Sequence, residues 1–174
     1  MSPALTALGA YPEPLVAQVR QLLVQGKLPS VLQGRYADPH QVRTDGALYD
    51  FVAELRARYL RKAPPVAKVH YDSTLHILRD ALGTHTAISR VQGGRLKAKH
   101  EIRIASLFKE APEEFLRMIV VHELAHFKER NHDKAFYQLC AHMEPAYHQY
   151  EFDLRVYLCH LEAGGEPLWK ARGS

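Results

Sequence analysis

The sequence predicts an α+β fold, a compact single domain with helices at both ends and a small sheet between them. Apolar residues recur at helical spacing on both sides of a central region, and that region contains short β-branched runs separated by glycines. The length of 174 residues is that of one domain. Hydrophobic residues make up 47% of the chain, which is enough for a core and unlike disordered proteins.

The first 65 residues are predicted to be mostly helical. A weaker helical pattern covers about residues 13–25. A stronger one begins after the cap-like pair Thr44-Asp45 and continues to about Lys62. The string KAPP at residues 62–65 then interrupts the pattern, so we expect residues 1–65 to be an N-terminal helical portion of the domain. The apolar positions of the stronger helix are Leu48, Phe51, Val52, Leu55 and Tyr59.

The following segment is predicted to form a small sheet of three or four mostly antiparallel strands. Its runs contain β-branched residues in partial alternation, and Gly83 and Gly93-Gly94 separate them as turn residues. The four runs are VAKVHYD (66–72), LHILRD (75–80), TAISRV (86–91) and KHEIRIASLF (99–108).

A central helix is predicted from Pro112 to about Arg130. Proline suits the first helical position, and Glu113 and Glu114 place negative charge where the helix dipole favours it. Asn131 tolerates the left-handed conformation that commonly ends helices, so we expect the chain to reverse there.

The C-terminal part is predicted to contain two more helices, over residues 133–143 and 147–162, with a break at Pro145. Cys140 and Cys159 lie inside these patterns and form no CxxC pair, so we interpret them as small buried hydrophobic residues without a chemical role. Residues 164–174 are expected to be a loosely held tail.

The charge pattern only weakly favours anionic partners. Lys and Arg exceed Asp and Glu by 23 to 19, but no basic run reaches five residues, which gives no indication of a nucleic-acid partner. The N-terminus lacks a basic leader followed by an apolar stretch, and no segment reaches about 18 apolar residues. We therefore expect a cytoplasmic protein without a membrane partner.

The string VVHELAHFKERNH at residues 120–132 contains the pattern HExxH followed by a third histidine. Residues four apart on a helix differ by about 40° around its axis, so His122 and His126 project side by side and can share one metal ion. Glu123 points about 100° away, which suits a general base for a metal-bound water better than a third ligand.

His132 is the predicted third ligand, because it lies just past the helix end, where the chain can carry it over the ion. A zinc ion held by three protein groups keeps its fourth position for water and lowers that water's pKa to about 7. We therefore predict one Zn²⁺ per chain. The downstream carboxylates Glu144 and Glu151 are alternative third ligands, and an exposed polar face of a structural helix is the alternative to a metal site.

Other polar residues have weaker assignments. Four of them follow the motif and are either donors to a developing oxyanion or packing residues, and the pattern singles out none. They are His142, Tyr147, His148 and Tyr150. The remaining histidines of the predicted strands and turns are interpreted as surface residues, namely His70, His76, His85 and His100.

The string VVHELAHFKERNHDKAFY at residues 120–137 resembles the HExxH metallopeptidases of the YgjP-like, WLM and SprT-like group, with YgjP-like proteins as the nearest subgroup. The resemblance covers about residues 66–160 and implies a zincin-like core over residues 66–163. It implies zinc ligands at His122, His126 and His132, a base at Glu123, and a trailing aromatic pair at Phe136-Tyr137. Residues 86–108 lack the RWGSC-like string typical of YgjP-like members.

The resemblance also implies that EIRIAS at residues 101–106 is a strand beside the cleft. Such a strand can pair with an extended peptide through backbone hydrogen bonds, and an ordinary interior strand is the equal alternative.

The leading interpretation is a zinc-dependent metallopeptidase acting on a peptide or protein, with Glu123 as the general base. A second hypothesis keeps the site and replaces the peptide by a non-peptide substrate such as a nucleoside triphosphate. A third is a DNA-associated or protein-binding module with a structural zinc. Structural zinc sites usually have four protein ligands, whereas this sequence offers three and a base, which argues against the third hypothesis.

Overall fold

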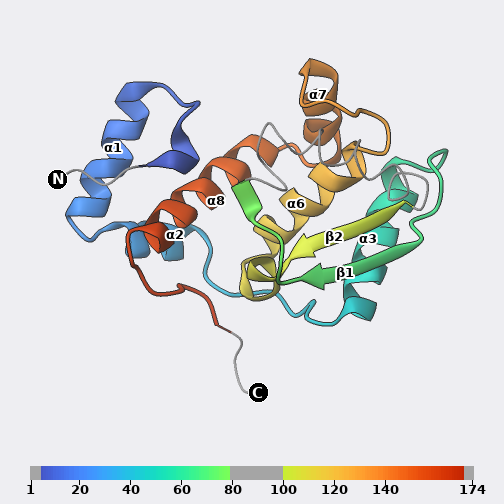
Figure 1. Cartoon of the computed structure of the whole chain (residues 1–174), viewed down its shortest axis with the longest axis horizontal. Helices are drawn as coiled ribbons and strands as arrows, with labels where there is room; N and C mark the ends of the chain where they lie inside the picture. The colour runs from blue at the N-terminus through green and yellow to red at the C-terminus, as the bar shows by residue number, and fades with distance from the viewer. Residues whose placement is uncertain (1–4, 79–99, 171–174) are drawn as a thin grey trace.

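The computed structural model describes residues 5–78 and 100–170, which form a mixed α+β domain (Figure 1). The helices are α1 (Glu13–Val24), α2 (Leu28–Arg35), α3 (Asp45–Tyr59), α6 (Glu113–Ala125), α7 (Lys134–Met143) and α8 (Tyr147–Glu162). The strands are β1 (Lys68–Asp72) and β2 (Glu101–Ala105), and the short 3₁₀ helices are η1 (Thr6–Leu8) and η3 (Ser106–Glu110).

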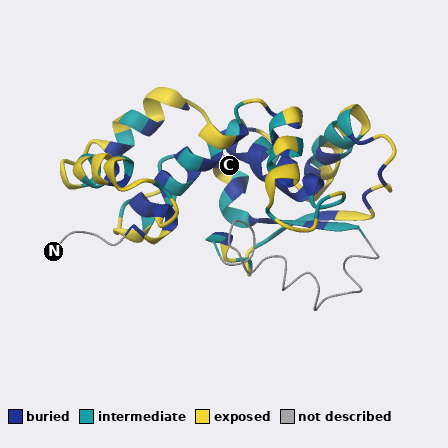
Figure 2. Ribbon diagram, turned by 90° about the horizontal axis from the view of Figure 1, so that it is seen from above, coloured by how far each residue is buried: buried dark blue, intermediate teal, exposed yellow. Residues whose placement is uncertain are grey.

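Helix α6 lies in the middle of the domain and positions the site. It packs against α7, α8, α3 and β2. Every residue from Met118 to Ala125 is buried, as expected of a helix that is covered on all sides. Glu113 and Glu114 lie within its first turn, as predicted, whereas Pro112 is the N-cap and not the first helical residue that we expected. Buried residues gather in these central helices, and exposed residues lie on the outer helices and turns (Figure 2).

The sheet differs from the prediction. In the described part of the chain it has two strands, and they are parallel, with Lys68 opposite Glu101 and Asp72 opposite Ala105. The prediction of three or four mostly antiparallel strands is therefore wrong for these residues. The glycines suggested tight antiparallel turns, but the paired strands are joined by the long connection 73–100, which suits a parallel pair.

Two of the four predicted strand runs contain the observed strands, β1 in 66–72 and β2 in 99–108. Of the other two, LHILRD has no strand in its described residues 75–78, and TAISRV at 86–91 lies outside the described residues.

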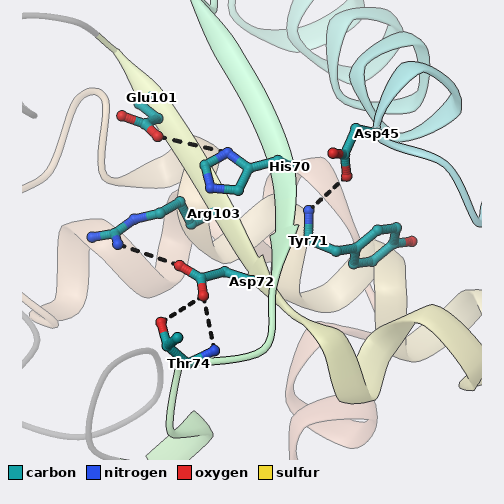
Figure 3. A network of polar contacts seen from close by, with 7 residues as sticks. All are labelled: Asp45, His70, Tyr71, Asp72, Thr74, Glu101 and Arg103. Atoms are coloured by element: carbon teal, nitrogen blue, oxygen red, sulfur yellow. Dashed lines mark hydrogen bonds and ion pairs between the residues drawn. The ribbon is translucent and has the colours of Figure 1, made fainter.

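One face of the sheet is apolar and packs into the core. Val69, Ile102 and Ile104 are buried there, and α3 packs against β1. The Thr44 side chain caps α3 by accepting a hydrogen bond from the Ala47 amide, so the predicted start of this helix is confirmed. Asp45 accepts a hydrogen bond of 2.9 Å from the Tyr71 amide (Figure 3), which satisfies a donor on the outer edge of β1.

Both ends of the described chain pack against helix α8, η1 at one end and Trp169 at the other. The predicted first helix is confirmed as α1, whereas α2 was not predicted; α2 and η1 both contact α8. Trp169 is 3% exposed and donates a hydrogen bond to the Tyr36 carbonyl, so residues 164–170 are held more firmly than the loose tail that we expected.

Among the described residues, no helix has both the length and the apolar character that a membrane span requires.

Candidate metal centre

Helix α6 ends earlier than predicted, within the HExxH motif. The helix ends at Ala125, not near Arg130, and His126 is its C-cap. Hydrogen bonds from the Phe127 amide to Leu124 and from the Glu129 amide to Ala125 form the turn that follows. Asn131 is not left-handed, because His100 is the one non-glycine residue with positive φ in the described ranges. Successive turn hydrogen bonds therefore reverse the chain, in place of one left-handed residue.

The next helix begins directly after this reversal. Asp133 is the N-cap of α7, and its side chain accepts a hydrogen bond of 3.0 Å from the Phe136 amide. This cap holds the preceding residue, His132, beside the end of α6.

The three histidines of the motif converge at this point. One ligand atom from each of His122, His126 and His132 lies within 4.8 Å of the others. The Nε2 atoms of His126 and His132 are 2.9 Å apart. His122 is 1% exposed, and the other two are partly buried. The structure thus brings together the residues that the sequence selected, while their role as ligands stays a prediction.

Hydrogen bonds on the far side of two of these rings orient them. His126 Nδ1 lies 3.0 Å from the Glu129 carbonyl oxygen. A carbonyl only accepts, so Nδ1 carries the proton and Nε2 keeps its lone pair. His122 Nδ1 lies 2.8 Å from the Tyr147 hydroxyl, which leaves Nε2 as the ligand nitrogen of that ring also. Such outer contacts are typical of histidines that bind metals.

An aromatic side chain contacts all three imidazoles. The Phe136 ring centroid lies 4.9 Å from that of His122, 4.6 Å from that of His126 and 4.9 Å from that of His132. Phe136 is fully buried, so it forms a rigid apolar wall that limits how far the imidazoles can rotate.

The donor set fits a borderline-soft divalent metal. Three imidazole nitrogens suit zinc and its transition-metal neighbours, whereas magnesium and calcium prefer oxygen ligands. Nitrogens bound to one tetrahedral zinc lie about 3.3 Å apart, given Zn–N bonds of about 2.0–2.1 Å. The ligand nitrogens of the three rings lie within 4.8 Å of one another, with one pair at 2.9 Å, so small ring rotations would produce that spacing. Among the residues described, the cluster contains no fourth protein ligand, which is the arrangement of catalytic sites.

The carboxylates of the motif region lie in three different settings. Glu123, the predicted base, follows His122 on α6 and is 2% exposed. Glu144 lies 3.3 Å from Arg117, and Glu151 lies 3.6 Å from Arg155. The histidine cluster includes neither Glu144 nor Glu151, so the structure does not support them as third ligands.

The four residues considered either as oxyanion donors or as packing residues lie in different settings. Tyr147 is fully buried and contacts His122. His142 stacks edge-on against Tyr59, and Tyr150 packs near Tyr36. His148 is exposed and packs against Tyr137. Sequence reasoning did not single out Tyr147 because its contact with His122 joins two helices 25 positions apart, and no local pattern indicates it.

Three of the four histidines predicted to lie on the surface are within the described residues. His76 is exposed, while His70 and His100 are half-buried, His70 lying 3.6 Å from Glu101 (Figure 3). His85 lies outside the described residues.

The cysteines fit the prediction. Both are free and buried, and burial raises the pKa of Cys140 to about 12 and that of Cys159 to about 11, so neither is a reactive thiolate.

A separate cavity of about 300 Å³ lies between α3, the start of α6 and the turn after α7. None of the three clustered histidines lines it.

Comparisons with known proteins agree with this geometry. The family model of the YgjP-like metallopeptidase domain matches residues 66–157. The Escherichia coli (strain K12) protein named UTP pyrophosphatase is 58% identical over 160 residues, which are 92% of this chain and 96% of that relative. No solved structure matches this chain.

Together, the family match and the histidine cluster define a metal-dependent hydrolase. The chain belongs to the YgjP-like family, as the resemblance of the motif predicted.

Proposed function

We propose that this protein is a zinc-dependent hydrolase that cleaves a nucleoside triphosphate, with UTP as the first candidate, into the monophosphate and pyrophosphate. The observation that carries the proposal is the 58% identity to a UTP pyrophosphatase over nearly the whole of both chains. Convergence of three imidazoles in this chain supports retention of a metal. This was the second hypothesis from the sequence, and it now takes precedence over peptide hydrolysis.

His122, His126 and His132 would hold the metal, and the fits of the donor set and of the ring orientations support zinc. A zinc ion bound there supplies a polarised water and a positive charge beside the reacting phosphorus. Glu123 accepts a proton from the attacking water as general base. The water oxygen bonds to the α phosphorus. The bond from that phosphorus to the oxygen that bridges the α and β phosphates breaks, and pyrophosphate leaves. A cytoplasmic location is part of the proposal, since nucleoside triphosphates are made and used there.

Peptide hydrolysis remains the second candidate, because the matching family model describes a metallopeptidase domain. The same base and the same ligands serve either reaction, so the cluster itself does not separate them. A non-catalytic module with a structural zinc is not retained, because the family and the relative indicate a hydrolase.

The test is a substrate screen on purified protein of known metal content. The protein is stripped with a chelator, reloaded with zinc, and offered UTP, the other nucleoside triphosphates and a set of unstructured peptides. The proposal expects one zinc per chain and metal-dependent release of pyrophosphate. Peptide cleavage without pyrophosphate release would favour the second candidate and contradict the first.

Glu123→Gln is expected to keep zinc and to lose activity by about 10²–10⁴-fold, since a general base contributes on that scale. Glu129→Gln is the matched control, because the backbone carbonyl of Glu129, and not its side chain, contacts His126. Equal rates for Glu123→Gln and the parent would contradict the role of Glu123.

A further inference from the structure

The inner face of His122 is connected to a buried polar chain on α8. The Tyr147 hydroxyl lies 2.8 Å from His122 Nδ1, and the two rings are nearly parallel, with an interplanar angle of 18°. Tyr147 is fully buried at the first position of α8. It therefore contacts His122 from the interior of the domain.

Glu151 lies one helical turn beyond Tyr147 and is 7% exposed. Burial raises the pKa of Glu151, while the charges of Arg155 and His148 and hydrogen bonds from Arg155 and Tyr147 oppose that rise. Arg155 in turn lies 3.6 Å from Glu151 and donates a hydrogen bond to the Ala7 carbonyl in η1. Glu151 is thus paired with Arg155, and Arg155 links this part of α8 to the N-terminal segment.

The position of the proton between His122 and Tyr147 follows from the proposed role of His122. A histidine binds a metal through the lone pair of one ring nitrogen, and Nδ1 of His122 already faces the Tyr147 hydroxyl. Nε2 is then the ligand atom, Nδ1 carries the proton, and the Tyr147 oxygen accepts the hydrogen bond. A neutral imidazole with Nδ1 protonated has its lone pair on Nε2, the nitrogen required for a metal ligand.

We propose that Tyr147 is a positioning residue that holds His122 as the Nδ1–H tautomer, in the ring orientation that binds the metal. This inference rests on the proposed role of His122 as a ligand. His126 reaches the same state through the Glu129 carbonyl, so the two helical ligands are fixed by different devices. The device for His122 depends on side chains and is therefore open to substitution.

Tyr147→Phe removes the hydroxyl and keeps the ring. Tyr36→Phe is the matched control, because Tyr36 is also a buried tyrosine that donates to a buried carboxylate, Asp153 at 2.5 Å, away from the histidine cluster. Both variants should lose some stability. Only the first should affect the cluster.

Two readouts separate positioning from general stability. Zinc affinity, measured by competition with a chromophoric chelator, should fall about 10–100-fold in Tyr147→Phe and stay within about twofold in Tyr36→Phe. In the zinc-free protein, ¹⁵N NMR of the histidine side chains should show His122 as the Nδ1–H tautomer in the parent and a shift toward Nε2–H in Tyr147→Phe.

A folded Tyr147→Phe variant with parental zinc affinity and an unchanged His122 tautomer would overturn the inference. If that variant does not fold, the tautomer of the parent decides the question. A zinc-free parent in which His122 carries its proton on Nε2 would overturn the inference equally.

Failure of the proposed function would look different. A parent protein that binds zinc but cleaves no nucleoside triphosphate contradicts the substrate, while the comparison of affinities and tautomers still decides the role of Tyr147. A parent protein that binds no zinc contradicts both.

Discussion

The histidine cluster and the polar face of the sheet contain similar residue types in opposite arrangements. On the sheet, His70 lies 3.6 Å from Glu101, and Arg103 lies 3.3 Å from Asp72 (Figure 3). Each basic group there has an acidic neighbour. In the cluster, three imidazoles face one another, and the group includes no carboxylate. Bases that converge in this way are stabilised by a bound cation, whereas the sheet face needs no ligand.

The largest expected effect comes from removing one imidazole from each region. His122→Ala should release the metal and abolish hydrolysis. The loss of metal affinity should exceed the loss of about 10–100-fold that follows when a hydrogen-bond partner of a metal ligand is removed. His70→Ala removes a half-buried side chain that lies beside Glu101 on the sheet, and should change the free energy of unfolding by less than about 1 kcal/mol. Metal content by mass spectrometry and pyrophosphate release measure both. A metal-loaded, active His122→Ala protein would reverse the assignment of the two regions.

The second-largest expected effect concerns Phe136, whose ring contacts all three imidazoles. Phe136→Ala should lower the free energy of unfolding by about 3–5 kcal/mol, because it removes a fully buried ring, and should also weaken zinc binding. Phe108→Ala is the control, since Phe108 is equally buried in η3. Denaturant unfolding and chelator competition give the two quantities. If both variants weakened zinc binding to the same degree, Phe136 would have no special relation to the cluster.

The central features of the fold and site were accessible from the sequence because local chemistry determines them. Thr44 caps α3, Pro112 and Glu113 mark the start of α6, and HExxH spacing aligns two imidazoles. The features that were missed depend on distant partners. The contact of His122 with Tyr147 joins α6 to α8, and the parallel pairing of β1 with β2 depends on how residues 73–100 connect them.

The early end of α6 was missed for a related reason. Apolar periodicity continues through Phe127, so the pattern does not show where the helix stops. The hydrogen bond between His126 Nδ1 and the Glu129 carbonyl and the cap by Asp133 favour the turn, and both become visible only in three dimensions.

The third prediction uses a histidine that belongs to neither region. His40 is 6% exposed; its Nδ1 accepts a hydrogen bond from the Val42 amide, and its Nε2 lies 2.6 Å from the Phe108 carbonyl. These contacts use the neutral ring, and burial lowers the pKa of His40 below 6.5. Above pH 6.5 the ring is neutral in both states. As pH falls below that value the unfolded state binds the proton first, so stability declines.

This loss has a maximum slope of about 1.4 kcal/mol per pH unit. His40→Gln does not titrate, so the difference in unfolding free energy between parent and variant should shrink as pH falls from 7.5 toward 5. Chemical denaturation across this range measures it. A constant difference would show that protonation of His40 is not linked to folding.

The smallest expected effect lies on the sheet face. Asp72 accepts hydrogen bonds from the Thr74 side chain and amide, and these contacts, with the charge of Arg103, lower its pKa. Asp72→Asn should cost less than about 1 kcal/mol of stability and leave zinc affinity unchanged. Thermal unfolding with and without zinc checks this. An effect on zinc binding would mean that the two regions are coupled.

The central claim is that three imidazoles hold one metal ion and leave a position for solvent. X-ray absorption spectroscopy at the zinc edge of the purified, zinc-loaded protein tests it most directly. The account predicts one zinc per chain, coordinated by three imidazole nitrogens and one oxygen, with one imidazole lost in His132→Ala. Sulfur in the coordination sphere, four protein ligands, or an unchanged spectrum in His132→Ala would contradict it.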